Sequence, residues 1–397
     1  MGTPYDHLPP RFPTETISSF ITSLSLPTPT AIKRLKGRAN FHLIYFITYD
    51  AATDLSTLPA NANTLSRDPD GSLTLVLRVS GNHIPRRKTA NEVGVLQWVR
   101  RNTRVPVPAV VLFDCTENNA LGREFTLLER VPGRSVDEFY DELDEVAKLR
   151  LIEQLTNFTL ELNAHDWSHI GGLQPSDVNG DMSPPVPGPV VEESFWLVPD
   201  IERYWGPGES NDTLNPGGPY VSHEEYVRAY LGIFIRAIHT HESLAWLRTT
   251  LAPRLETLKS MHIPQLATSR LVLAHKDLHF ANVMAADDGT ITGILDWEFA
   301  GVVPALRWDP VRAFLWNGRH DKASQAEKDR MRTLFMDELE RKDIDPWMVE
   351  LPEVHVVWNV LNFTRALTEV CPRGERMTAV EGWRDAALGH LAELGVS

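Results

Sequence analysis

At 397 residues the chain is longer than a usual single domain of about 100 to 200 residues, so we expect two lobes that share a cleft. Its 42% hydrophobic and 23% charged residues are typical of a globular protein, and no apolar run approaches the roughly 18 residues that cross a bilayer. The formal net charge of −14 argues against a nucleic-acid-binding protein, because phosphate contacts need clustered Lys and Arg.

Cysteine content and the first residues of the chain favour a cytoplasmic location. Cys115 and Cys371 are too few for a disulfide framework or a four-cysteine metal site. Near the N-terminus no basic stretch precedes an apolar core, and position 6, where myristoylation needs Ser or Thr, is Asp6. We therefore expect no targeting segment and no membrane anchor.

The first third of the chain predicts an antiparallel sheet with one inserted helix. Residues 1–30 are rich in Pro, Ser and Thr and are expected to form an N-terminal arm or helix. The runs that follow are strand Ala39–Tyr49, strand Ser72–Ser80, helix Lys88–Arg100, strand Val105–Phe113 and strand Glu124–Val131. Between the first two strands, Asp70 and Gly71 supply turn chemistry.

The remainder of the chain is mainly helical. Apolar residues repeat at three- and four-residue spacing from Val146 to His165, which predicts a core helix. Residues 174–261 begin with a Pro- and Gly-rich stretch and contain Trp196, Tyr204 and Trp205, so we expect a helical insertion whose aromatic side chains contact a substrate. Packing of these rings in a core is the alternative. A sheet followed by helices predicts a two-lobed α+β fold and not alternating βαβ units.

The segment from Leu271 to Glu298 carries the residues with recognisable chemistry. An apolar strand precedes Asp277, Asn282 follows five residues later, and a second strand from Ile291 to Leu295 ends at Asp296. Phosphoryl transfer requires an aspartate that orients and accepts a hydroxyl proton, together with oxygen ligands for Mg²⁺. Two carboxylates and one amide at these strand ends fit those roles.

Two other interpretations of this segment remain open. In the first, it is a hairpin whose polar residues merely cap turns. In the second, His275, Asp277 and His279 form a hydrolytic metal site, because the HxDxH spacing can bind Zn²⁺. No further histidine cluster in the sequence supplies a second half-site for that metal.

The motifs of this segment resemble one enzyme family. HKDLHFAN followed by ILDWE is similar to the catalytic and metal-binding loops of the aminoglycoside phosphotransferase and choline-kinase-like family, particularly its fungal small-molecule kinase-like members. LKGRAN with FHLIYFITY resembles the family's nucleotide-covering hairpin, LVLRVS its third strand, NEVGVLQWV its ion-pairing helix and FTLLERVPG its hinge. The resemblance extends over roughly Ala31 to Trp316.

This resemblance implies a protein-kinase-like fold and a division of labour. Residues 31–131 would be the nucleotide-binding N-lobe and 132–397 the C-lobe, with the substrate-binding insertion around 174–261. The family implies Asp277 as the catalytic base, Asn282 and Asp296 as Mg²⁺ ligands, and His275 as a residue that orders the catalytic loop. ATP or GTP would be the co-substrate, and a small hydroxylated metabolite or antibiotic the acceptor.

The phosphate-binding half of the site departs from the family pattern. Arg78 stands where the family commonly has a lysine, with Glu92 as its expected partner. The covering loop offers only Gly37, with Asn40 as a further expected phosphate donor.

Two neighbouring positions complete the predicted site. Backbone groups between Glu129 and Val131 would bind the base. Lys276 is either a cation that steadies the transferred phosphate or an exposed lysine without a role. Because of Arg78 and the glycine-poor loop, a catalytically weak or inactive nucleotide-binding protein is the alternative function.

Overall fold

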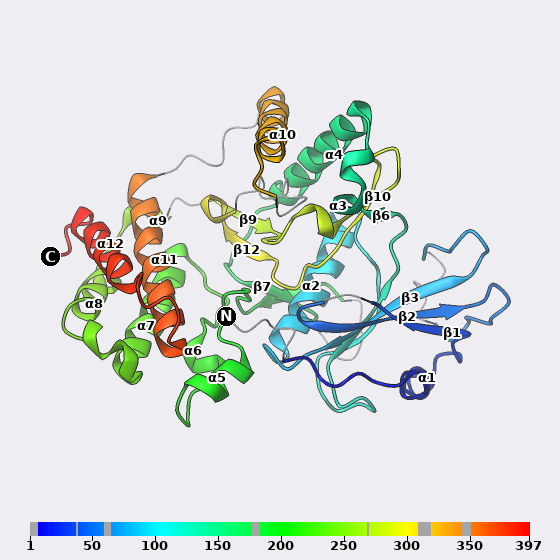
Figure 1. The fold of residues 1–397 in the computed structure, drawn as a ribbon, viewed down its shortest axis with the longest axis horizontal. Helices are drawn as coiled ribbons and strands as arrows, with labels where there is room; N and C mark the ends of the chain where they lie inside the picture. The colour runs from blue at the N-terminus through cyan, green and yellow to red at the C-terminus, as the bar shows by residue number, and fades with distance from the viewer. Residues whose placement is uncertain are drawn as a thin grey trace.

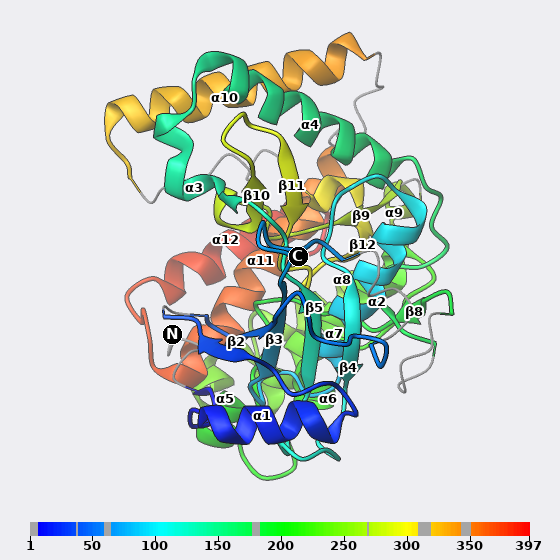
Figure 2. The same ribbon diagram turned by 90° about the vertical axis from the view of Figure 1, so that its right-hand side faces the viewer.

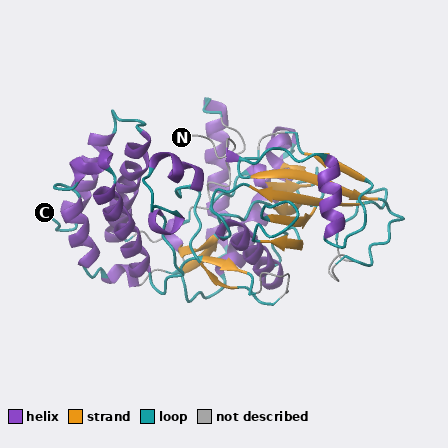
Figure 3. Ribbon diagram, turned by 90° about the horizontal axis from the view of Figure 1, so that it is seen from below, coloured by secondary structure: helices purple, strands orange, loops and turns teal. Residues whose placement is uncertain are grey.

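The computed structural model describes residues 7–36, 39–58, 65–176, 183–267, 270–308, 319–342 and 351–397. A β-sheet occupies one end of the elongated molecule and a helical bundle the other (Figures 1 and 3). Gly37, predicted to contact phosphate, lies outside the described residues. None of the helices in the described ranges is long and apolar enough to span a bilayer.

The N-terminal sheet has five antiparallel strands in the order β1-β2-β3-β5-β4. Its strands are β1 (Ala31–Arg34), β2 (His42–Tyr49), β3 (Leu73–Ser80), β4 (Val110–Asp114) and β5 (Phe125–Glu129). Before β3 the backbone N–H of Gly71 donates to the carbonyl oxygen of Asp68 at 2.8 Å with a φ of +83°, a conformation that glycine adopts without a steric penalty. The predicted antiparallel sheet and its turn are confirmed.

Two helices pack on this sheet. Helix α1 (Thr14–Ser23) lies along the sheet (Figure 2) and buries Ile17, Phe20 and Ile21. The Phe20 ring meets Phe125 of β5 edge to face at 4.9 Å. Helix α2 (Arg87–Asn102) buries side chains on most of its circumference because it lies between the sheet and the rest of the molecule (Figure 1).

A glycine lets α2 approach the C-terminal region closely. A Cβ atom on Gly94 would lie 2.6 Å from backbone atoms of β7 (Gly172–Gln174). One turn earlier, Asn91 Nδ2 donates to the carbonyl oxygens of Glu298 at 3.0 Å and Ala300 at 2.8 Å. Helix α2 is therefore fixed to the segment that carries Asp296.

The C-terminal region is mainly helical, as the sequence predicts. Its longer helices are α4 (Glu145–Asn163), α7 (His223–Thr240), α8 (Ala252–Ser260), α10 (Lys322–Arg341), α11 (Pro352–Arg373) and α12 (Val380–Glu393). Helices α4 and α10 lie side by side (Figure 2), while α11 packs on α7 and α12. Shorter helices are α3 (Val136–Phe139), α5 (Val198–Tyr204), α6 (Asn211–Leu214) and α9 (Pro264–Ala267).

Small antiparallel ladders hold the catalytic segment. Strand β9 (Leu271–Ala274) pairs with β12 (Gly301–Pro304), and β10 (Val283–Ala285) pairs with both β11 (Ile291–Ile294) and β6 (Arg134–Ser135). A separate pair joins β7 to β8 (Val186–Gly188). Asp277 follows β9 and Asp296 follows β11, so these ladders fix the two loops relative to each other. This is the two-lobed α+β arrangement expected of a protein-kinase-like fold.

A buried histidine in the helical bundle gives a pH-dependent prediction. Burial, and then the nearby Arg307, lower the pKa of His223 to about 4 from 6.5. Trp358 Nε1 donates to its Nε2 at 3.1 Å, so the folded bundle needs the neutral ring. Between pH 6.5 and 4 the unfolded chain binds more protons at this histidine than the folded protein does. As the pH is lowered through this range, His223 should therefore reduce the free energy of unfolding by up to about 3 kcal/mol.

Replacement of that histidine by a neutral acceptor tests the prediction. In His223→Gln the amide oxygen can still accept from Trp358, but the acid-dependent loss from this position should disappear. Urea unfolding of both proteins at pH 7, 5 and 4 measures the difference. Parallel stability curves for the two proteins would contradict the assignment.

Candidate active site

A cavity of about 580 Å³ lies between the sheet and the catalytic ladders. Its walls bring together most of the residues that the sequence predicts for the site, namely Asn40, Arg78, Glu92, Glu129, Val131, Asp277, Asn282 and Asp296. His275 is fully buried behind this wall. The predicted positions therefore converge on one cleft, whereas their chemical roles stay predictions.

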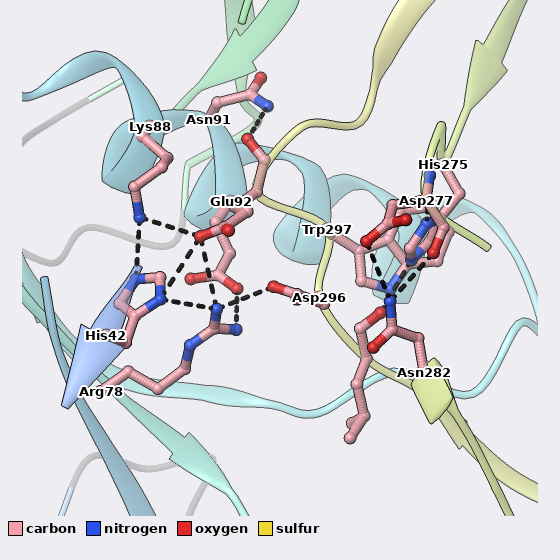
Figure 4. Close-up of polar contacts among 12 residues, drawn as sticks. His42, Arg78, Lys88, Asn91, Glu92, His275, Asp277, Asn282, Asp296 and Trp297 are labelled. Atoms are coloured by element: carbon pink, nitrogen blue, oxygen red, sulfur yellow. Dashed lines mark hydrogen bonds and ion pairs between the residues drawn. The ribbon is translucent and has the colours of Figure 1, made fainter. Parts of the chain in front are cut away.

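Asp277 faces this cavity from the loop after β9. Its side chain is 42% exposed, and Asn282 Nδ2 donates to its carbonyl oxygen at 2.9 Å and, with longer geometry, to Oδ2 at 3.4 Å (Figure 4). His279 Nε2 lies 3.6 Å from the same Oδ2. The carboxylate is thus oriented by the amide five residues later while one side remains open to a ligand.

His275 connects the two catalytic loops through backbone bonds. Its Nε2 donates to the carbonyl oxygen of Leu295 at 2.8 Å, and its Nδ1 accepts from the backbone N–H of Asp277 at 3.3 Å. Burial lowers the pKa of His275, which favours the neutral ring that these two bonds require. The imidazole links the residue before Asp296 to the backbone of Asp277.

These bonds also bear on the metal-hydrolase alternative. Both ring nitrogens of His275 are engaged by the backbone, so neither is directed at a ligand. Within the described ranges no group of three or more His, Cys, Asp or Glu residues is arranged to hold a metal ion. The HxDxH spacing therefore does not correspond to a built zinc site here.

Both catalytic loops contain a residue in the left-handed backbone region. Lys276 and Asp296 each have a φ of +66°, which is strained for residues with a Cβ atom. Lys276 Nζ donates to the Val191 carbonyl at 3.0 Å and lies 3.9 Å from Glu192 Oε1, and the residue lines a second cavity beside Asp277 and not the first one. The prediction of an exposed Lys276 is wrong, since its side chain is only 19% exposed, while its action on a transferred phosphate stays a prediction.

Asp296 approaches the cleft from the other loop. Arg78 NH2 donates to its Oδ1 at 2.8 Å, and the side chain is 35% exposed (Figure 4). Burial acts to raise the pKa of Asp296, but Arg78 outweighs burial, so the pKa lies below its usual range and the group is ionised.

The predicted partnership of Arg78 and Glu92 is confirmed. Arg78 NH1 donates to Glu92 Oε1, and the other terminal nitrogen reaches Asp296. Burial disfavours the charge of Arg78, yet its pKa is raised because Glu92, Asp296 and Glu298 surround it. The guanidinium is held in place by carboxylates from α2 and from the loop after β11.

Sequence reasoning did not predict the roles of three further residues of this network, Lys88, His42 and Glu298. Lys88 Nζ lies 2.9 Å from Glu298 Oε2 and 3.0 Å from His42 Nε2, and all three side chains are buried (Figure 4). Burial, only partly offset by Lys88, raises the pKa of Glu298 to about 7. The sequence offered one indication of this contact: Lys88 precedes Glu92 by one helical turn, so the two side chains lie on the same face of α2.

Removal of this buried ammonium should destabilise the protein. In Lys88→Met the Glu298 carboxylate loses its 2.9 Å partner, and we expect a loss of about 2 to 4 kcal/mol in the free energy of unfolding. Denaturant unfolding measures it, with Lys148→Met as the matched control because Lys148 pairs with Glu327 at 3.5 Å near the surface and should cost less than about 1 kcal/mol. Addition of Glu298→Gln to Lys88→Met should recover much of the loss, whereas an unchanged double variant would contradict this account.

At the predicted hinge, the Glu129 side chain is already hydrogen-bonded, whereas, in the part of the chain that the structure describes, the Val131 backbone N–H is not. The Glu129 carboxylate is used internally, because it accepts from the backbone N–H of Ser66 at 2.9 Å and of Ala109 at 3.1 Å. Val131 also lines the cavity, and within the described residues its backbone N–H has no hydrogen-bond acceptor.

A second cavity, of about 500 Å³, adjoins the first. Asp277, Glu193 and Phe299 line both cavities, so the two spaces meet at the carboxylate of the catalytic loop. Glu192, Glu193 and Ser194 come from the predicted insertion, and Arg307 and Arg365 from later in the chain. Sequence reasoning singled out none of these residues, because their spacing follows no motif.

For Trp196 and Trp205 of the aromatic run, the structure favours the alternative, packing in a core. Trp196 and Trp205 are buried and meet edge to face at 5.3 Å, and the Arg373 guanidinium lies 3.9 Å from the Trp196 ring centroid. Neither they nor Tyr204 line the two large cavities. The apolar surface of these rings stabilises the bundle, while the residues just before them line the second cavity.

Relatives of this chain come from fungal gene clusters. Clavilactone A biosynthesis cluster protein Y of Ampulloclitocybe clavipes is 29% identical over 232 residues, which are 55% of this chain and 51% of that protein. A subtelomeric hrmA-associated cluster protein of Aspergillus fumigatus is 29% identical over 133 residues, or 33% of this chain and 25% of that protein. The chain thus spans about half or less of the length of these curated relatives.

Similar solved structures include aminoglycoside phosphotransferases at low identity. The gentamicin complex of APH(2")-IIa has 12% identity and a TM-score of 0.47, with 96% of each chain covered. The GDP complex of wild-type aminoglycoside 2'-phosphotransferase-IIIa has 14% identity and a TM-score of 0.44, with 96% of this chain and 99% of that chain covered.

Family membership follows from the sequence profile. Residues 54–328 match the Phosphotransferase enzyme family, and this range contains β3, α2 and both catalytic loops. The match extends over more than half of the chain. The protein therefore belongs to the phosphotransferase enzyme family.

Proposed function

We propose that the protein transfers the γ-phosphate of ATP or GTP to a hydroxyl group of a small molecule, with Asp277 as the catalytic base. The observation that carries this proposal is the position of Asp277 on the wall shared by the two cavities. A nucleotide in the 580 Å³ space and an acceptor in the 500 Å³ space would meet at this carboxylate. In-line phosphoryl transfer requires such a meeting point.

Each catalytic residue has a task that its contacts support. The Asp277 carboxylate orients the acceptor hydroxyl and takes its proton, while Asn282 holds the loop in register. His275 acts indirectly, because it joins the backbone of Asp277 to Leu295 and so keeps the two loops at a constant separation.

The donor set of this site fits a magnesium ion. Mg²⁺ prefers a few oxygen ligands and keeps several waters, and the ionised Asp296 carboxylate with the Asn282 amide oxygen provides such a set beside the cavity. Asp296 and Asn282 would hold the ion. When bound, Mg²⁺ would neutralise charge on the phosphate oxygens during transfer.

Other residues of the cavity would bind the nucleotide. Arg78 presents a buried guanidinium that is suited to phosphate oxygens, and Asn40 faces the same space. The backbone N–H of Val131 can donate to the base, whereas the Glu129 carboxylate is already engaged and contributes through its position in the hinge wall. Gly37 remains a predicted phosphate contact.

The acceptor would be a small hydroxylated metabolite or antibiotic, and the cytoplasm fits the two buried, unbridged cysteines. A nucleotide-consumption assay across such acceptors tests the proposal, run beside Asp277→Asn to define background hydrolysis. Consumption that is independent of every acceptor and unchanged in the variant would refute phosphotransfer.

One observation favours a second candidate, a nucleotide-binding protein without turnover. Arg78 replaces the usual lysine and donates to Asp296, so the predicted metal ligand is partly occupied by a neighbouring cation. Tight nucleotide binding without phosphotransfer to any acceptor would support this alternative.

A further inference from the structure

The charged groups of the 500 Å³ cavity are distributed unevenly. Asp277 and Glu193 lie where it joins the nucleotide cavity, while Arg307 and Arg365 belong to the part that does not face the nucleotide cavity. Burial, and then Asp277 and Asp296, raise the pKa of Glu193. The reacting side of the cavity is therefore acidic and the remaining wall carries guanidinium groups.

The third carboxylate in this cavity, Glu192, is ionised, and neighbouring groups already balance its charge. Tyr226 donates to Glu192 Oε1 at 3.0 Å, and Lys276 Nζ lies 3.9 Å from the same oxygen. Burial would raise the pKa of Glu192, but Lys276 and then Arg307 outweigh it, so the carboxylate is charged and matched by nearby cations. Glu192 has little capacity left to attract a ligand ammonium group.

Arg307 acts on Glu192 from a distance but forms no close ion pair within the described residues. Its guanidinium carbon lies 3.7 Å from the ring centroid of Trp358, so the flat face of the group is stacked while its N–H edge stays exposed. No carboxylate of the described residues lies within ion-pair distance of it. Arg365, in contrast, is paired with Glu369 at 3.2 Å.

A smaller cavity of about 140 Å³ opens on the same wall. Arg307, Trp358, Asn362 and Arg365 line it, and Arg307, Asn362 and Arg365 also line the 500 Å³ cavity. Two guanidinium groups, one amide and the charge-matched Glu192 carboxylate line this space, which is large enough for a carboxylate or phosphate group. A planar guanidinium edge binds such oxyanions with two parallel hydrogen bonds.

We propose that the acceptor is an alcohol that also carries an oxyanion, whose charged group binds Arg307 and Arg365 while its hydroxyl faces Asp277. This inference rests on the proposed phosphotransferase function and adds the chemical class of the acceptor. A polycationic amine would place positive charge against Arg307, Arg365 and Lys276, an arrangement that costs free energy.

A binding experiment separates this inference from turnover. With ADP and Mg²⁺ at saturation, calorimetry compares hydroxycarboxylic acids of graded length with their primary amides, matched amino alcohols and phosphomonoesters of matched diols. In the unsubstituted protein an oxyanion probe should bind at least about ten-fold more tightly than its neutral counterpart. Arg307→Gln should abolish this preference.

The matched control is Arg203→Gln, because Arg203 is an exposed arginine stacked 5.2 Å from the Tyr204 ring centroid and lines neither large cavity. It should retain the preference. Tighter binding of the acid or of the phosphomonoester supports the site and assigns the oxyanion. Preference for amino alcohols or amides, a preference that survives Arg307→Gln, or no oxyanion binding at millimolar concentration overturns it.

Outcomes for the two proposals remain distinguishable. Asp277-dependent phosphorylation of neutral or amine-bearing alcohols would retain the proposed function and refute the oxyanion site. Oxyanion binding that requires Arg307, without Asp277-dependent phosphotransfer to any alcohol, would retain the site and refute the function.

Discussion

Asp277→Asn should reduce turnover by roughly 10² to 10⁴-fold while nucleotide affinity stays nearly constant. The amide keeps the shape of the side chain but cannot accept the hydroxyl proton. Asp277 lies where the two cavities join, and the backbone contacts of its loop to His275 and Asn282 do not depend on its carboxylate charge. The loss should therefore appear in kcat and not in nucleotide binding.

Steady-state kinetics with an identified acceptor, together with nucleotide calorimetry, measures both quantities. The control is Asp385→Asn, which removes an exposed carboxylate on α12 that pairs only locally with Arg384 at 2.7 Å. Its kinetics should match the unsubstituted protein. A kcat of Asp277→Asn within a few-fold of the control would exclude the base assignment.

Asp296→Asn should remove the Mg²⁺-dependent part of nucleotide affinity. Loss of even an outer-shell partner lowers metal affinity roughly 10- to 100-fold, so loss of a direct ligand should cost on the order of 100-fold or more. Arg78 would keep Glu92 and the nearby Glu298, so the fold should survive the change.

Calorimetry of nucleotide binding in Mg²⁺ and in EDTA gives the test without relying on activity. The unsubstituted protein should bind more tightly in Mg²⁺, whereas Asp296→Asn should show the same affinity in both buffers. Asp385→Asn again serves as the control. If the variant retains the full Mg²⁺-dependent gain, Asp296 is not a metal ligand.

Local pattern predicted where Asp277 and Asp296 lie relative to the two strands that precede them. The strand before Asp277 and the strand before Asp296 have clear apolar runs, and each run ends where the polar residue begins. The family resemblance predicted that Arg78 and Glu92 would meet, and they do. The two strand ends are local features, because the backbone geometry of a strand by itself determines the direction in which each side chain points.

Contacts between distant segments were beyond that reasoning. Lys88, His42 and Glu298 meet across 46 and 210 residues of chain, so their pairing depends on how α2 is seated between the sheet and the C-terminal region. The exposure of Lys276 was misjudged because its positive φ turns the side chain toward the insertion. Composition could not decide where the aromatic run packs, because it cannot tell a core ring from a pocket wall.

By itself, the sequence determined the α+β class and the three oxygen-bearing residues of the catalytic segment, since strand periodicity and motif spacing are local properties. Only the tertiary structure decided that Asp277 is shared by two cavities and that Arg307 presents an open guanidinium edge to one of them. The physical reason is that cavity shape and the balance of buried charge arise from packing between segments far apart in the chain. No single segment contains all the residues that line the second cavity.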